Sequence, residues 1–507
     1  MNTLLIRADA SPRIGTGHIM RCLALAQIWQ EQGGKALFLS YCNSDILRRR
    51  IESEKIGFIP LEKFHPDRLD IKLTLQMLSE LEDHNSEMSS WVVADGYNFD
   101  ALYQKCIKEA GASLLCIDDY GHADHYYADI ILNQNIFADC SLYPRREKYT
   151  RLLLGTRYAL LRREFRDQRD RMREIPQIAR KVLVTMGGGD SDNVTLKAIR
   201  ALKKIDAIGI EAMIILGPAN PNRQAIEEEI QSCPSSFRLL PVVENISALM
   251  AWADVAVAAS GSTSWELAFM GLPSVVLILS ENQIAVAEHL ASEGLAINLG
   301  WHRDVSARMI TDKLKALMAD EDARNIMCKT GQSLVDGEGI MRVIMSMTMD
   351  SLSLRPIQEQ DCEQIWKWSN SPEARAASFT SQYIPWRDHV QWFKSKLHDS
   401  FCLFFMAVNG WGTPIGQVRI DQKIQEAVLS VYVEGKYRGI GCGSKIIELA
   451  SNKFFQVSDM RSIYAYVKLE NEESRRAFMR AGFKFQGLTT ISGCSAIHLA
   501  LEKNDSE

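Results

Sequence analysis

This chain has no closely spaced pair of cysteines, no long apolar run and no excess of positive charge. Its 11 cysteines are scattered and never form a Cys-x-x-Cys pair, as expected in a reducing compartment. No apolar run approaches the ~18 residues of a membrane span, and no charged leader precedes the first predicted strand. The formal net charge of -5 offers nucleic acids and acidic membranes no attraction. We therefore expect a cytoplasmic protein that acts on small molecules, without nucleic-acid or membrane partners; no pattern indicates an oligomeric state.

The length of 507 residues predicts about three domains. In residues 1–165, short apolar runs alternate with helical patterns, which predicts a parallel sheet with helical crossovers. The predicted strands are residues 4–6, 36–39, 91–94, 114–117 and 130–132. The acidic clusters Asp95-Gly96-Tyr97 and Asp118-Asp119-Tyr120 follow two of these strands. Each is typical of a helix cap or turn, with a ligand site as the alternative.

A glycine-rich motif, residues 14–21, lies between the first predicted strand and a helical pattern. Gly15 and Gly17 allow positive φ and close approach of a ligand. His18 supplies an imidazole that can take a proton from water. A strand–turn–helix of this kind also brings backbone amides to an anion. The alternative is a plain turn with a surface histidine.

Residues 166–346 repeat the α/β pattern. A predicted strand at 182–185 leads into Gly187, Gly188 and Gly189, a candidate phosphate cradle without the Lys-Ser/Thr of a Walker sequence. A later strand at 255–258 leads into residues 260–266. There Gly261, Ser262 and Thr263 offer neutral donors to a diphosphate, and the Glu266 carboxylate can accept two ribose hydroxyls. The alternative is that this segment only caps a helix.

The tandem arrangement resembles the GT-B architecture of nucleotide-sugar enzymes. Arg7-Ala8-Asp9, the motif at 14–21, residues 260–266 and Glu281-Asn282-Gln283 resemble the UDP-sugar hydrolases of pseudaminic acid biosynthesis, relatives of MurG-type glycosyltransferases, over residues 1–346. The resemblance implies hydrolysis of UDP-2,4-diacetamido-2,4,6-trideoxy-β-L-altropyranose with release of UDP. It implies His18 as the base, with Asp9 orienting water, His18 or the sugar. The implied UDP-sugar ligands are Gly15, Gly17, Arg21, Gly187, Gly188, Gly189, Gly261, Ser262, Thr263, Glu266, Asn282 and Gln283. No cluster of carboxylates and histidines indicates a metal.

In the third region, residues 352–503, alternating patterns at 401–408, 414–421 and 427–433 predict an antiparallel meander. It leads into a glycine-rich turn at 438–443 that can wrap a pyrophosphate. Read alone, this turn could be a dinucleotide fingerprint, but it lacks a parallel βαβ context.

Together with Asn471, Phe478 and the run at 481–483, this turn resembles the GNAT acetyltransferases. Acetyl-CoA is then the implied co-substrate, with its pantetheine beside the strand at 429–433. Its implied ligands are Val431, Val433, Arg438, Gly439, Ile440, Gly441, Cys442, Gly443, Ser444, Asn471, Ser474 and Phe478. Phe478 stands where many GNAT enzymes have a tyrosine, so no general acid is assigned.

The sequence thus predicts an α/β protein with two Rossmann-like domains in a GT-B arrangement, followed by an α+β GNAT domain. The two resemblances together imply N-acetylation of the C4 amine of UDP-4-amino-4,6-dideoxy-N-acetyl-β-L-altrosamine, then hydrolysis of the diacetamido product. One alternative is a UDP-sugar-dependent glycosyltransferase fused to an unrelated N-acetyltransferase. A second is a sensor that binds nucleotide sugar or acetyl-CoA without turnover.

Overall fold

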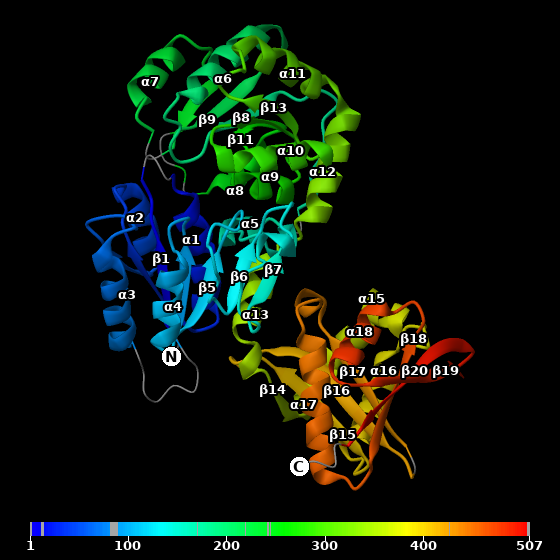
Figure 1. The fold of residues 1–507 in the computed structure, drawn as a ribbon. Helices are drawn as coiled ribbons and strands as arrows, with labels where there is room; N and C mark the ends of the chain where they lie inside the picture. The colour runs from blue at the N-terminus through cyan, green and yellow to red at the C-terminus, as the bar shows by residue number, and fades with distance from the viewer. Residues whose placement is uncertain are drawn as a thin grey trace. The chain divides into compact units, whose positions relative to one another are not determined.

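The computed structural model describes residues 3–11, 15–81, 90–169, 171–217, 220–240, 243, 245–424 and 426–503. The chain divides into two compact units, an N-terminal unit at Met1–Ile344 and a C-terminal unit at Met345–Glu507. Two parallel sheets form the N-terminal unit, and one mostly antiparallel sheet forms the C-terminal unit (Figure 1). The predicted fold class is therefore confirmed. All 11 cysteines are free thiols.

The first sheet is parallel, with the strand order β3-β2-β1-β4-β5-β6-β7. Its strands are β1 (Thr3–Ala8), β2 (Lys35–Ser40), β3 (Gly57–Pro60), β4 (Trp91–Asp95), β5 (Ser113–Ile117), β6 (Ile130–Asn133) and β7 (Arg151–Leu154). Its helices are α1 (Gly17–Glu31), α2 (Asp45–Ser53), α3 (Arg68–Leu81) and α4 (Ala101–Glu109). All five predicted strands are confirmed. Prediction missed the edge strands β3 and β7; both are only partly buried, and β3 has just Phe58 and Ile59 between its glycine and its proline.

The second sheet is parallel, with the strand order β10-β9-β8-β11-β12-β13. Its strands are β8 (Lys181–Thr185), β9 (Glu211–Ile215), β10 (Phe237–Leu240), β11 (Val255–Ala259), β12 (Ser274–Ile278) and β13 (Ile297–Trp301). The helices from the end of the first sheet onward are α5 (Arg163–Arg166), α6 (Val194–Leu202), α7 (Arg223–Gln231), α8 (Ile246–Trp252), α9 (Thr263–Phe269), α10 (Ile284–Ser292), α11 (Ala307–Ala319), α12 (Glu321–Leu334) and α13 (Gly339–Met347).

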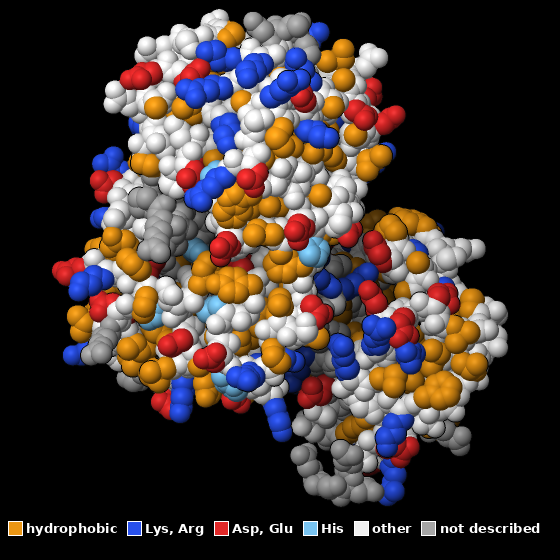
Figure 2. Space-filling model, turned by 45° about the horizontal axis from the view of Figure 1, so that its top comes forward, with side chains coloured by type: hydrophobic (Ala, Val, Ile, Leu, Met, Phe, Trp, Pro, Cys, Tyr) orange, Lys and Arg blue, Asp and Glu red, His pale blue; other side chains and the backbone are white. Residues whose placement is uncertain are grey.

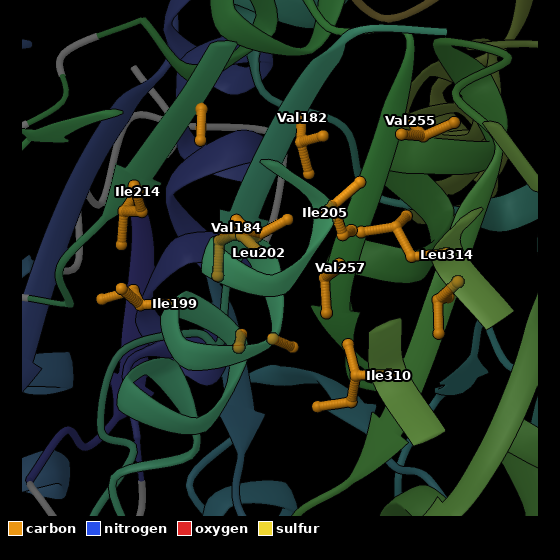
Figure 3. Close-up of a cluster of buried hydrophobic side chains, with 14 of the residues drawn as sticks. Val182, Val184, Ile199, Leu202, Ile205, Ile214, Val255, Val257, Ile310 and Leu314 are labelled. Carbon is orange, nitrogen blue, oxygen red and sulfur yellow. The ribbon is translucent and has the colours of Figure 1, made fainter. Parts of the chain in front are cut away.

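One face of the second sheet packs against α6 and α11 (Figure 3). Val184 and Val257 on neighbouring strands are fully buried, as are Ile199 of α6 and Ile310 of α11. Each such side chain contributes about 1.5–3 kcal/mol on leaving water. This packing holds the strands in place, so the loops at their carboxyl ends have a rigid support.

The sheet of the C-terminal unit has the order β14-β15-β16-β17-β18-β20-β19. Its strands are β14 (Ser353–Pro356), β15 (Cys402–Val408), β16 (Pro414–Gln422), β17 (Ala427–Val433), β18 (Ser462–Lys468), β19 (Lys484–Ile491) and β20 (Cys494–Glu502). Its helices are α14 (Cys362–Ser369), α15 (Pro372–Ala377), α16 (Trp386–Leu397), α17 (Cys442–Val457) and α18 (Glu472–Arg480). The predicted meander β15-β16-β17 is confirmed.

One junction of this sheet is parallel. β17 and β18 pair at Val428 and Tyr464, near the start of both strands. The later residues of β17, including Val431 and Val433, pair with β16 on the other side. The glycine-rich turn follows β17 directly and leads into α17.

The surface carries charges of both signs. On the face shown in Figure 2, lysine and arginine side chains are interspersed with aspartate and glutamate. In the part of the chain that the structure describes, no helix has both the length and the apolar character needed to cross a bilayer.

Candidate active sites

His18 lies in the first turn of α1, directly after the glycine-rich turn, and pairs with Asp95 at the end of β4. Its Nδ1 atom lies 2.6 Å from Asp95 Oδ1, and both side chains are buried. Burial alone would raise the pKa of Asp95, but Arg21 and His18 outweigh it and lower this pKa. An ionised carboxylate only accepts hydrogen bonds, so His18 Nδ1 carries the proton. The other ring nitrogen, Nε2, is then the one that can take a proton from water.

Arg21 holds this pair from one turn further along α1. Its Nε and Nη2 atoms donate to Asp95 at 2.7 and 2.6 Å, and Nη1 donates to Asp119 at 2.8 Å. The Arg21 side chain is 7% exposed. The Arg21 charge, set against burial, lowers the pKa of Asp119 as it does that of Asp95. Arg21 therefore fixes the two carboxylates at the ends of β4 and β5, and its predicted contact with a UDP-sugar stays a prediction.

Tyr97 connects the His18 site to the second sheet. Its ring meets the His18 ring edge-on, with 5.1 Å between centroids. Its hydroxyl donates to Asp119 at 2.7 Å and accepts from Asn282 Nδ2 at 3.0 Å. Burial, followed by the Asp119 charge, raises the pKa of the phenol, so it keeps its proton. Asn282, predicted to reach the sugar, thus lies beside the His18 site.

Two close approaches bring the glycine-rich loops of both sheets together. Gly17 lies so near Ser262 that a Cβ on the glycine would be 3.4 Å from the serine Oγ. A Cβ on Gly188 would lie 2.3 Å from Thr16 Oγ1, too close for any side chain. Gly187 adopts φ +80°, where glycine is favoured. The predicted diphosphate loops therefore adjoin the motif that carries His18.

Glu266 and Gln283 both have partners within the protein. Glu266 pairs with Arg162 at 3.0 Å. Burial raises the pKa of Glu266, and Arg162 opposes that rise. Gln283 Oε1 accepts from the Leu279 amide at 3.0 Å and so holds the loop after β12. The predicted contacts of these two residues with ribose and sugar remain predictions.

Asp9 belongs to a different buried network. Arg7 donates to it at 2.6 and 3.0 Å, and the backbone amides of Tyr41 and His65 donate at 2.9 and 3.0 Å. Of the roles expected for Asp9, orienting His18 falls instead to Asp95, because β4 lies next to β1 and brings its terminal carboxylate to the imidazole. A direct role of Asp9 toward water or sugar stays a prediction.

The C-terminal unit carries its glycine-rich turn between β17 and α17. Gly439 and Gly441 adopt φ values of +74° and +97°, a conformation that exposes successive amides to an anion. The Arg438 side chain is turned toward the end of β17, since its Nε donates to the Val433 carbonyl at 2.8 Å. The remaining predicted ligands of this turn, Ile440, Cys442, Gly443 and Ser444, lie in it or in the first turn of α17.

Asn471 and Phe478 both lie at α18. The Asn471 side chain caps the helix by accepting from the Ser474 amide at 3.1 Å. Phe478 is buried and meets Phe483 edge-on at 5.0 Å. Phe478 has no hydroxyl, so it cannot supply a proton.

The chain matches two known domain families. Residues 182–336 match the glycosyltransferase family 28 C-terminal domain, and residues 351–484 match the acetyltransferase (GNAT) domain. The chain therefore joins two enzyme domains.

Three curated relatives extend these matches. The spore coat polysaccharide biosynthesis protein SpsG of Bacillus subtilis is 27% identical over 341 residues, which cover 67% of this chain and 95% of that protein. The UDP-2,4-diacetamido-2,4,6-trideoxy-β-L-altropyranose hydrolase of Campylobacter jejuni is 26% identical over 296 residues, 58% of this chain and 98% of that protein. Spermidine N(1)-acetyltransferase of Escherichia coli K12 is 22% identical over 139 residues, 27% of this chain and 75% of that protein.

Sequence reasoning missed the residues that hold the base. The sequence around Asp95 and Asp119 is typical of a helix cap or turn, with a ligand site as the alternative, and the structure shows that these residues bind His18, Arg21 and Tyr97. Their place at the ends of neighbouring parallel strands, where ligand sites form, favours the alternative of a ligand site but does not show which side chains they bind. Among the described residues, no three histidine, cysteine, aspartate or glutamate side chains gather as a metal site.

Proposed function

We propose that the chain is a bifunctional enzyme of pseudaminic acid biosynthesis. Its GNAT domain acetylates the C4 amine of UDP-4-amino-4,6-dideoxy-N-acetyl-β-L-altrosamine with acetyl-CoA. Its N-terminal unit then hydrolyses UDP-2,4-diacetamido-2,4,6-trideoxy-β-L-altropyranose to UDP and free sugar. The observation that carries the hydrolase assignment is the buried His18–Asp95 pair beside Tyr97 and Asn282.

The hydrolytic step needs a base for water and charge stabilisation for the departing UDP. His18 Nε2 takes a proton from water as the water oxygen attacks C1 of the sugar. The bond between C1 and the phosphate oxygen breaks, and UDP leaves with the bonding electrons. Asp95 stabilises the imidazolium that forms. Attack on the face opposite UDP inverts the configuration at C1.

The leaving group and the sugar are assigned to the second sheet. Amides and hydroxyls of Gly261, Ser262 and Thr263, with the turn at 187–189, hold the diphosphate. Glu266 accepts the ribose hydroxyls while Arg162 fixes its carboxylate. Asn282 contacts the sugar. The approach of Gly17 to Ser262 supports this arrangement, because it brings the nucleotide loop next to the base.

The acetyl-transfer step is assigned to the open side of β17. In this proposal the turn at 438–443 binds the pyrophosphate of acetyl-CoA, and the pantetheine lies along Val431 and Val433. β17 and β18 pair at Val428 and Tyr464, so the later part of β17 can offer backbone groups to the pantetheine amides. The neutral C4 amine attacks the thioester carbon and the C–S bond breaks. The nitrogen releases a proton to solvent, and the sulfur takes one from solvent.

The two steps form a sequence because the second substrate carries the acetamido group that the first step makes. The relative from Campylobacter jejuni, named for the hydrolysis step alone, aligns with 58% of this chain, which leaves the GNAT domain to supply the earlier step.

A glycosyltransferase is the competing function, and the match to the glycosyltransferase family 28 domain favours it. Incubation with the diacetamido UDP-sugar and no acceptor separates the two. A hydrolase releases UDP steadily until the substrate is consumed. A chain that releases UDP only when a sugar acceptor is added is a transferase, and this result would refute the proposed hydrolysis.

A further inference from the structure

A second histidine–aspartate pair lies beside the first. His122 follows β5, and its Nδ1 atom lies 2.7 Å from Asp118 Oδ2. The two side chains are 8% and 0% exposed. The His122 ring meets the Tyr97 ring edge-on, with 6.2 Å between centroids. Tyr97 is also the residue whose ring contacts His18. Two imidazole rings therefore contact the same tyrosine.

Asp118 is fixed in position and charged. The amides of Tyr120 and Gly121 both donate to it at 2.7 Å, and the Tyr126 hydroxyl donates as well. Its carboxylate has no proton to donate, because its pKa is lowered by His122 and these donors against the effect of burial. A positive ring at His122 is the state that compensates this buried negative charge.

The surroundings of His122 favour the charged imidazolium. Burial alone would lower its pKa, but Asp118, the Phe99 backbone and Asp119 together raise it. Asp118 belongs to the loop after β5, whereas Phe99 and Tyr97 belong to the loop after β4. The other ionisable groups that face the ring are the phenols of Tyr120 and Tyr126. The charge on His122 therefore links the loop after β5 to the loop after β4, beside Tyr97.

We infer that His122 is a positioning residue of the hydrolase, which as an imidazolium paired with Asp118 holds Tyr97 against His18 and Asn282. The inference rests on the proposed hydrolysis and adds a second protonation requirement to it. His18 must be neutral to accept a proton from water. His122 must be charged to keep Tyr97 in place.

The test is the pH profile of kcat for UDP release by the full chain. We expect wild type to lose rate at high pH as His122 loses its proton. In His122→Gln we expect kcat to fall about 10- to 100-fold, in the range of positioning effects, with the high-pH loss gone. His122→Arg keeps the charge and should restore part of the rate without a high-pH loss. A His122→Gln variant that retains both the wild-type rate and the high-pH loss would overturn the inference.

Two controls separate a local role from a general defect. His125 lies three residues further on and pairs with Glu147 at 3.1 Å near the surface, so His125→Gln should leave kcat and its pH profile unchanged. Acetylation by the same preparation checks that the C-terminal unit is intact, and a thermal melt checks the fold of the N-terminal unit. If His122→Gln fails to fold, the test uses His122→Arg instead. The kcat of His122→Arg must then show no fall at high pH.

A second measurement does not depend on turnover. NMR titration of the wild-type chain follows the His122 ring and the Tyr97 ring signals together. We expect the Tyr97 signals to move with the titration of His122, and this movement to be absent in His122→Gln. If wild type released no UDP, the proposed hydrolysis would be refuted. The coupling between the His122 and Tyr97 signals would still show whether His122 positions Tyr97. Tyr97 signals that do not change as His122 titrates would refute the positioning role of His122.

Discussion

Asp95 determines which nitrogen of His18 can act as a base. The carboxylate accepts from Nδ1 at 2.6 Å and leaves Nε2 for water. In Asp95→Asn the amide can present its NH2 group to Nδ1, which favours the tautomer with the proton on Nε2 and removes the base. We expect kcat for UDP release to fall about 10²- to 10⁴-fold, the range of general acid–base catalysis. Steady-state assays of UDP release measure this.

The matched comparison is Asp45→Asn. Asp45 lies in the first turn of α2, and its side chain is 78% exposed. This variant should retain the wild-type rate. An Asp95→Asn enzyme within threefold of wild type would show that Asp95 does not control the protonation of His18.

Residue identity alone could predict His18 but not its partners. A histidine that directly follows two closely spaced glycines and an apolar strand is visible in the sequence. Asp95 lies 77 positions from His18, and only the strand order β1-β4-β5 brings it to the imidazole. The pairing of Arg21 with Asp95 and Asp119 could not be predicted either, because one sequence does not show which cations are neutralised by carboxylates of the same chain.

At the scale of elements, the turn between β17 and α17 depends on backbone conformation. Gly441 has φ +97°, and a Cβ there would meet no atom within 4 Å. Space is therefore available, but a β-branched side chain is strained at this φ. In Gly441→Val we expect the turn to shift and the KM for acetyl-CoA to rise at least about tenfold, the equivalent of ~1.4 kcal/mol. UDP release from pre-acetylated substrate should be unchanged.

Gly412 offers the control. It lies between β15 and β16 in the same unit, has φ +78° and also has open space around its Cβ position. Gly412→Val imposes a similar strain away from the predicted acetyl-CoA turn, so its KM for acetyl-CoA should stay near wild type. Equal KM increases in both variants would mean that strain in the unit, and not loss of the turn, is responsible.

Element prediction succeeded where apolar runs are continuous and missed the edge strands β3, β7 and β13. The buried strands β1, β4, β8 and β11 have continuous apolar runs and were predicted. The edge strand β13 was missed because every one of its residues is only half-buried. The parallel junction of β17 and β18 could not be predicted, because strand pairing depends on contacts far apart in sequence.

At the scale of the whole molecule, the N-terminal unit should be sensitive to acid. Asp95 and Asp118 are buried and Asp119 is mostly buried, and all three carboxylates have lowered pKa values at one edge of the first sheet. Unfolded aspartate titrates near pH ~3.9, so the unfolded chain binds more protons than the folded chain below about pH 5. The stability these groups provide is complete above that pH and is lost as pH falls.

Hydrogen exchange followed from pH 7 to pH 4 tests this expectation after correction for the intrinsic exchange rate. Amides of β4 and β5 should lose protection on acidification, and earlier than those of β15 and β16 in the C-terminal unit. Equal protection of β4 and β5 at both pH values would contradict the assignment of these carboxylates as buried and charged.

The most direct test of the account is an NMR time course of His18→Ala with UDP-4-amino sugar and acetyl-CoA, run beside wild type. Wild type should form the N-acetylated UDP-sugar and then release UDP, with the first sugar anomer inverted at C1. His18→Ala should acetylate at the wild-type rate and accumulate the diacetamido UDP-sugar without releasing UDP. Release of UDP by His18→Ala at the wild-type rate would contradict the central claim that this imidazole activates water.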